Sequence, residues 1–124
     1  MALNGNMNNK TVEGLVTSHE ARNEKLRDVF LQKKADLTEP RLIECHFWIW
    51  SEAGALRLAE GLKNRGFEIL VQRRAGTASD PDRWNLEAAV TQSIALTLRH
   101  EFIDELVRLA DSIGGVYDGW GTRM

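Results

Sequence analysis

The sequence contains a single cysteine, Cys45, so it cannot form an internal disulfide. Structural zinc sites usually need several cysteines, and one thiol cannot supply them. No apolar run approaches the ~18 residues of a membrane-spanning helix. The Asn-rich first ten residues also lack the apolar core of a signal peptide. We therefore expect a cytoplasmic protein that does not enter a membrane.

An excess of charge of one sign is also missing. The chain carries 16 Lys and Arg residues against 18 Asp and Glu residues, a net charge of -2. Proteins that coat nucleic acid or bind anionic membranes usually carry a strong positive charge. The balance disfavours direct binding to nucleic acid or to a membrane surface.

The sequence lacks the motifs of common enzyme classes. G-x-x-x-x-G-K-[ST], G-x-G-x-x-G and G-x-S-x-G are all absent. Cys45 and His46 are adjacent in a predicted strand, so their side chains point to opposite faces and cannot form a dyad. His19, His46 and His100 show no metal-ligand spacing. We predict no catalytic residues, no metal and no cofactor, and hence a protein that is not an enzyme.

What is present fits one domain, since 124 residues match the size of a typical single domain. The Asn-rich start, residues 1–16, is predicted to be flexible, and residues 17–124 to form the domain. Thr17 and Glu20 have the spacing of a capping box, which predicts a helix that starts at Thr17. The helix would end before Pro40.

The remaining pattern alternates between strand and helix periods. Ser51 is a predicted helix N-cap, and Gly66 a predicted C-terminal cap. The predicted elements are a strand over Arg41–Trp50, a helix from Ser51 to Gly66, a strand over Phe67–Arg74, a loop over 75–82, a strand within Trp84–Ile94, a helix over Thr97–Ile113 and a strand over Val116–Trp120.

This order predicts an α+β fold, a ferredoxin-like β-α-β-β-α-β sandwich with an additional N-terminal helix. The first and third strands would lie in the middle of the sheet, and the second and fourth at its edges. Both later helices would cover one face of the sheet. The other face would carry His46, Trp48 and Trp50.

Four tryptophans are many for so short a chain, and all lie in or beside predicted strands. Large aromatic side chains on an open sheet face commonly anchor a protein partner, which makes Trp48 and Trp50 candidate binding residues. They could equally fill a core beneath the leading helix. A weaker alternative is RNA binding by the arginines around the second strand, Arg65, Arg73, Arg74 and Arg83, although such charges more often protect a sheet edge.

The segment Tyr117-Asp118-Gly119-Trp120-Gly121, directly after an amphipathic helix, resembles the end of RraB-family proteins, regulators of ribonuclease activity. The order of elements over residues 41–122 is also similar to that family. The resemblance implies a protein-binding inhibitor whose partner is an endoribonuclease, RNase E-like, or its scaffold region, and which modulates RNA decay in bacteria.

The last strand adds Tyr117, Asp118 and Trp120 to the candidate protein-binding residues. Gly119 and Gly121 would allow a bulge or a close backbone approach there. The same motif could instead be a folding device, with Trp120 packed in the sheet and Asp118 hydrogen-bonded to a neighbouring segment. An adaptor role, including a homodimer in which two sheets pair, is the remaining alternative.

Overall fold

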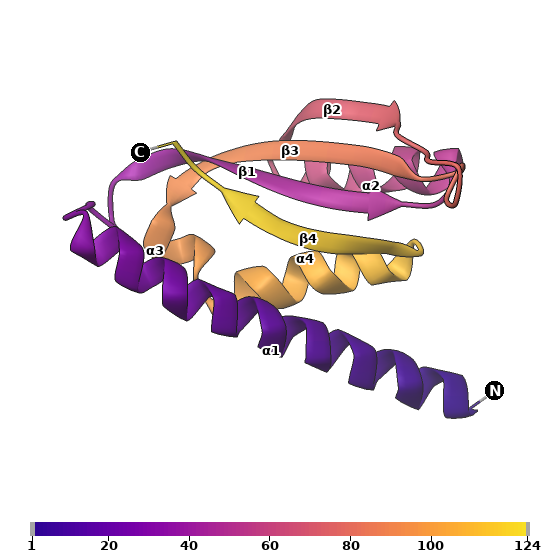
Figure 1. Cartoon of the computed structure of the whole chain (residues 1–124), viewed down its shortest axis with the longest axis horizontal. Helices are drawn as coiled ribbons and strands as arrows, with labels where there is room; N and C mark the ends of the chain where they lie inside the picture. The colour runs from indigo at the N-terminus through magenta and orange to yellow at the C-terminus, as the bar shows by residue number, and fades with distance from the viewer. Residues whose placement is uncertain (1, 124) are drawn as a thin grey trace.

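A computed structural model describes residues 2–123 of the chain, with side chains from Thr11 onward (Figure 1). Its elements are α1 (Ala2–Gln32), β1 (Pro40–Ile49), α2 (Glu52–Asn64), β2 (Glu68–Arg74), β3 (Trp84–Ser93), α3 (Ile94–Thr97), α4 (His100–Ser112) and β4 (Gly115–Gly121). The four strands form one sheet in the order β2-β3-β1-β4, and neighbouring strands are antiparallel. The predicted middle strands, β1 and β3, and edge strands, β2 and β4, are confirmed.

The alternation of β1 sets the position of the core. Its apolar set, Ile43, Cys45, Phe47 and Ile49, is completely buried. Opposite these residues on β3 lie Ala88, paired with Cys45, and Leu86, paired with Phe47. Because a strand alternates its side chains between two faces, this register directs one apolar face of the sheet towards the helices.

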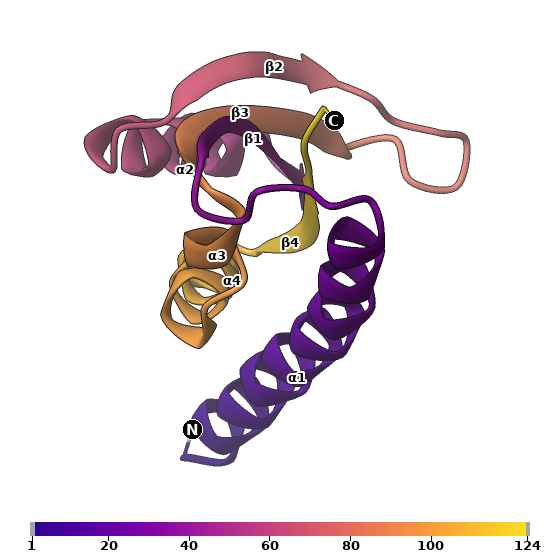
Figure 2. The same cartoon turned by 90° about the vertical axis from the view of Figure 1, so that its left-hand side faces the viewer.

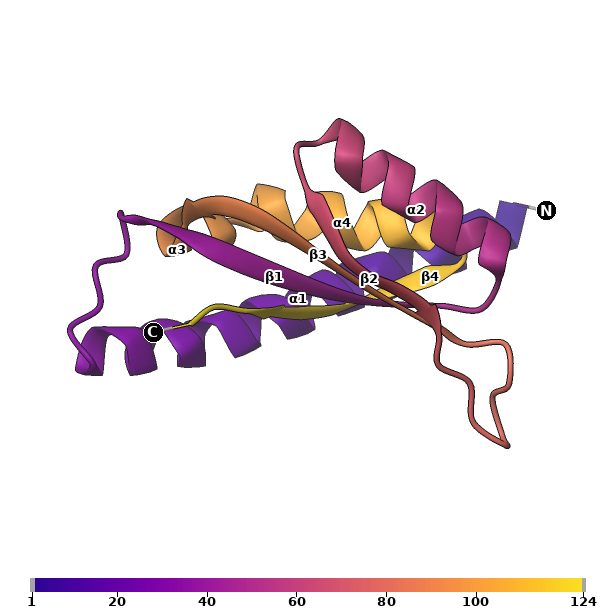
Figure 3. The same ribbon diagram turned by 90° about the horizontal axis from the view of Figure 1, so that it is seen from above.

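All three long helices lie on the same side of the sheet (Figures 2 and 3). Helix α1 runs beside α4 and beneath β4, where Val12, Val16 and Phe30 are buried. The leading helix therefore extends the helical layer. In the part of the chain that the structure describes, no helix covers the opposite face of the sheet.

The ends of α2 agree with the sequence. The Ser51 hydroxyl oxygen accepts a hydrogen bond of 2.9 Å from the Gly54 backbone N–H. Gly66 has φ +88°, a left-handed conformation that a residue without Cβ adopts at no steric cost. The predicted caps are confirmed.

The predicted start of the first helix at Thr17 is wrong, because α1 begins at Ala2. The Thr17 hydroxyl donates to the Glu13 carbonyl oxygen at 2.9 Å, the back-bond of a threonine inside a helix. Glu20 pairs with His100 of α4 and takes no part in a capping box. Val12 and Val16, one turn apart, already contact the core, so the packed part of α1 starts before Thr17.

The predicted helix over Thr97–Ile113 corresponds to α4, which begins three residues later at His100, and a separate short helix, α3, precedes it. Arg99 has an extended conformation, with ψ 145°, and separates α3 from α4. Ser93 caps α3, since its hydroxyl oxygen accepts from the Leu96 N–H at 3.0 Å. The buried Thr97 hydroxyl donates to the Ser93 carbonyl oxygen at 2.9 Å. These local bonds stabilise the single turn of α3 directly after β3, and a segment this short shows no apolar periodicity in the sequence.

None of the helices over residues 2–123 combines the length and the apolar character that a membrane span requires.

Candidate protein-binding site

Two tryptophans of the uncovered sheet face are held by the loop between β2 and β3. The guanidinium of Arg83 lies 4.1 Å from the centre of the Trp48 ring, a cation–π contact. Trp50, 41% exposed, donates its indole N–H to the Asp80 carboxylate at 2.7 Å. We call Trp48, Trp50, Asp80 and Arg83 the tryptophan cluster. These contacts hold the indole rings of Trp48 and Trp50 in place in the unbound protein.

A shallow cleft of about 350 Å³ adjoins this cluster, where β1 turns into α2. Arg74 is fixed there, since it donates to the Asp82 carboxylate at 3.2 Å and to the Pro81 carbonyl oxygen at 3.0 Å. Trp84, half-buried, also packs against the core. The residues that line the cleft are Trp50, Ser51, Glu52, Arg74, Asp82 and Trp84. Indole rings beside charged groups are typical of the centre and rim of protein interfaces.

The middle of the uncovered face is polar. His46 on β1 and Glu87 on β3 are directly opposite each other, and His46 Nδ1 lies 3.2 Å from Glu87 Oε1. Both side chains are partly exposed. The face is therefore not an ordinary apolar sheet surface, and its aromatic part is confined to the tryptophan cluster at one end.

The Tyr117–Gly121 motif forms a β-bulge. His46 pairs with Gly119 and Phe47 with Tyr117, so Asp118 is the extra residue of β4. Gly119 has φ +120° and packs against Arg22, to which any Cβ would lie within 2.7 Å. The predicted bulge and a close approach are confirmed at Gly119, whereas Gly121 has no close neighbour.

Helix α1 docks on this bulge through polar side chains. His19 Nε2 donates to the Tyr117 carbonyl oxygen at 3.0 Å, and Arg22 donates to the Asp118 carbonyl oxygen at 3.0 Å. Burial lowers the pKa of His19, which favours the neutral ring, and the carbonyl acceptor requires a proton on Nε2. Backbone carbonyls that an edge strand would leave to solvent are thus used to hold α1.

Trp120 completes the contact between β4 and α1. Its ring stacks on Phe30 with 6.0 Å between ring centres. Its indole N–H donates to the Asn23 amide oxygen at 3.0 Å. These contacts agree with the alternative in which Trp120 serves the fold. The contact of Asp118 with α1 is made by its backbone carbonyl oxygen, which accepts from Arg22.

The candidate binding residues are therefore placed very differently. Trp50 and Asp118 are exposed, Trp48 is half-buried on the uncovered sheet face, and Trp120 is half-buried against α1. Tyr117 is 2% exposed and packs against Phe47, so its side chain can influence binding only through the fold.

Cys45 belongs to the same core. Burial raises the pKa of its thiol to about 12, so the nucleophilic thiolate is suppressed. The structure also places Cys45 and His46 on opposite faces of β1, as predicted. Among the described residues, no group of His, Cys, Asp and Glu side chains is arranged to hold a metal ion.

The structure does not gather the four arginines of the RNA-binding alternative. Arg65 precedes β2 in the chain and donates to the Glu105 carboxylate on α4 at 2.7 Å. Arg73 and Arg74 lie at the other end of that strand, close to Arg83. Arg83 donates to the Ala75 carbonyl oxygen through two nitrogens, both at 3.3 Å. Arg74 and Arg83 therefore serve mainly to hold the loop that orders the tryptophans.

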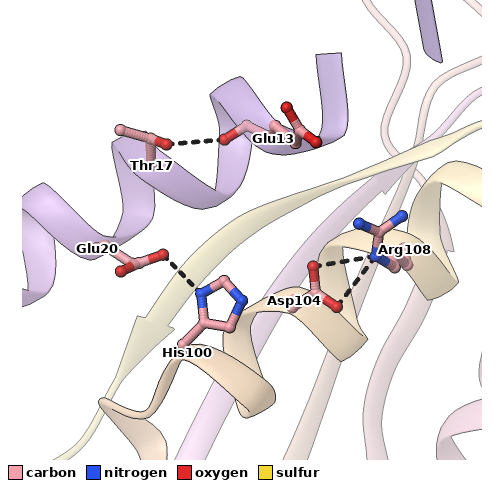
Figure 4. A network of polar contacts seen from close by, with 6 residues as sticks. All are labelled: Glu13, Thr17, Glu20, His100, Asp104 and Arg108. Carbon is pink, nitrogen blue, oxygen red and sulfur yellow. Dashed lines mark hydrogen bonds and ion pairs between the residues drawn. The ribbon is translucent and has the colours of Figure 1, made fainter. Parts of the chain in front are cut away.

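Sequence reasoning missed Asp80 and Arg83 as partners of the tryptophans, and the ion pair of 2.9 Å between Glu20 and His100 (Figure 4). Asp80 lies in a segment rich in turn formers, whose conformation no periodicity predicts. Glu20 and His100 are separated by most of the domain.

Comparison with protein families gives a match over residues 20–122 to the family described as Regulator of ribonuclease activity B, RraB. The curated proteins searched with the chain give no match. The matched region begins within α1 and ends just after β4, so it includes the whole sheet, the tryptophan cluster and the bulge. The chain belongs to the RraB family, a family of regulators of ribonuclease activity.

Proposed function

We propose that the chain inhibits an endoribonuclease of the RNase E type by binding the enzyme or its non-catalytic scaffold region in the cytoplasm. The membership of the RraB family carries this proposal, because the family is described by regulation and not by catalysis. The strand order with β1 and β3 in the middle supports a ferredoxin-like fold, a common scaffold for binding surfaces. On this proposal the protein is not an enzyme.

The tryptophan cluster is the proposed contact surface. Tryptophan is among the residues that most often dominate the energy of an interface. Trp48 and Trp50 are already held by Arg83 and Asp80, so little side-chain entropy is lost when a partner binds. Asp118, exposed at the bulge of β4, is a second proposed contact. Tyr117 and Trp120 would act indirectly, because they keep α1 and β4 together.

A cleavage assay tests the proposal. RNase E would cleave a model RNA in the presence of increasing amounts of this protein, once as the full-length enzyme and once truncated to its catalytic part. Inhibition of the full-length enzyme alone identifies the scaffold region as the target, and inhibition of both forms identifies the catalytic part. No effect on either form rules out the proposed function.

A further inference from the structure

A groove of about 510 Å³ lies between α1 and the segment that joins α3 to α4. It is lined by Glu20, Asn23, Glu24, Arg27, Asp28 and Leu98. The three acidic residues recur at every fourth position of α1, so their side chains form one stripe along the helix. The groove lies on the helical side of the molecule, away from the tryptophan cluster.

The negative charge of this groove is only partly neutralised by other residues of the chain. Glu20 is paired with His100, whose Nδ1 lies 2.9 Å from Glu20 Oε1 (Figure 4). Glu24 and Asp28 make no ion pair or hydrogen bond with any residue from Thr11 to Arg123. Arg27 adds one positive charge to the lining. Two exposed carboxylates are therefore available to a cationic group.

A second feature of the groove is an unused donor in its wall. Asn23 is 5% exposed, and its amide oxygen is occupied by the Trp120 N–H. Its Nδ2 atom is buried and has no hydrogen-bond partner among the described residues. A buried donor without a partner is costly, and an acceptor oxygen brought by a ligand would satisfy it.

We propose that this groove binds an arginine- or lysine-rich segment of a protein partner. The cationic head groups pair with Glu24 and Asp28, a backbone carbonyl oxygen accepts from Asn23 Nδ2, and aliphatic side-chain stems pack on Leu98. A peptide carries both a cation and an acceptor, which this lining requires. A metal ion or a polyamine has no acceptor for Asn23. The inference rests on the proposed function in taking the partner to be a protein.

Binding of a fluorescein-labelled arginine-rich peptide, followed by fluorescence anisotropy, tests the groove. We expect the double variant Glu24→Gln/Asp28→Asn to weaken binding about fivefold, since exposed ion pairs are individually weak. The matched control is Glu60→Gln/Asp111→Asn, which removes the same charges from exposed positions on α2 and α4. Equal weakening by both double variants, or no binding by the wild-type chain, would overturn the proposal.

The side-chain amide of Asn23 gives an independent readout by NMR. Its proton resonances should shift when the peptide is added and stay in place when spermine is added. An unmoved Asn23 signal in the peptide complex would overturn the assignment.

The cleavage assay separates this inference from the proposed function. If the wild-type chain fails to inhibit RNase E but the peptide binds with the expected losses, only the proposed function fails. If inhibition is observed and the peptide does not bind, only the groove fails. Weaker inhibition by the Glu24→Gln/Asp28→Asn variant supports both.

Discussion

Gly119 is the residue whose identity the bulge of β4 most strongly requires. Its φ of +120° is unfavourable for any residue with a Cβ, and an added Cβ would lie 2.7 Å from Arg22 Nη1. We expect Gly119→Ala to lower the free energy of unfolding by about 1–3 kcal/mol. Chemical denaturation followed by circular dichroism measures the change.

Gly121 provides the control in the same strand, because a Cβ there would meet nothing within 4 Å. Gly121→Ala should leave the free energy of unfolding nearly unchanged. Repeating Gly119→Ala in an Arg22→Ala background separates backbone strain from the contact with the guanidinium. Equal losses at both glycines would contradict this account.

His100 should make the docking of α1 dependent on pH. Its hydrogen bond with Glu20 raises the pKa of the imidazole above its usual 6.5, and Asp104 and Glu101 act in the same direction. The stabilisation is complete below the unfolded pKa of 6.5 and is lost as pH rises through the higher folded pKa. We expect His100→Gln to lower the free energy of unfolding more at about pH 5.5 than at about pH 8.

His19 should show the opposite sign. Burial lowers its pKa below 6.5, so the unfolded chain binds a proton that the folded chain resists, and stability falls as pH drops through 6.5. A His19→Gln variant, compared with wild type over the same pH range, should lose this acid sensitivity. If both histidine variants change the pH profile in the same direction, the assignment of the two sites is wrong.

At the scale of elements, substitutions along α1 show where the folded domain begins. Val16 is 4% exposed in the core, whereas Val29 of the same helix is 43% exposed. We expect Val16→Ala to cost about 1.5–2 kcal/mol of the free energy of unfolding, and Val29→Ala less than about 0.5 kcal/mol. Thermal and urea unfolding of both variants measure the difference. Equal, small effects would favour the predicted flexibility of residues 1–16.

The sequence predicted strands better than helix ends. Alternation identified the buried face of β1, because a pleated strand with one face in a core must repeat every second residue. Helix α1 was predicted too short, since its Asn-rich first turns lack an apolar stripe. The later start of α4 was missed because nothing in the spacing marks the extended conformation of Arg99. The short helix α3 was missed because four residues are too few to show a period.

At the scale of the whole molecule, the candidate surfaces required knowledge of contacts between distant segments. The alternation of β1 predicted that Trp48 and Trp50 share a face, but not that Arg83 and Asp80 hold them. The acidic stripe of α1 is visible in the sequence. The groove itself also needs Leu98, which is distant from the stripe in the sequence. The unpaired Nδ2 of Asn23 likewise emerges only from the contacts of the folded chain.

The tryptophan cluster yields the prediction that concerns the whole molecule. Trp48→Ala and Trp50→Ala should each weaken inhibition of RNase E at least tenfold, because the truncation of a tryptophan at the centre of an interface commonly costs more than about 1.4 kcal/mol. Leu56→Ala on α2 removes another exposed apolar side chain and should leave inhibition unchanged. The unfolding free energy of each variant shows whether the fold is intact. Full inhibition by both tryptophan variants would move the contact away from this sheet face, and a partial loss only in Asp118→Ala would assign it to the bulge of β4.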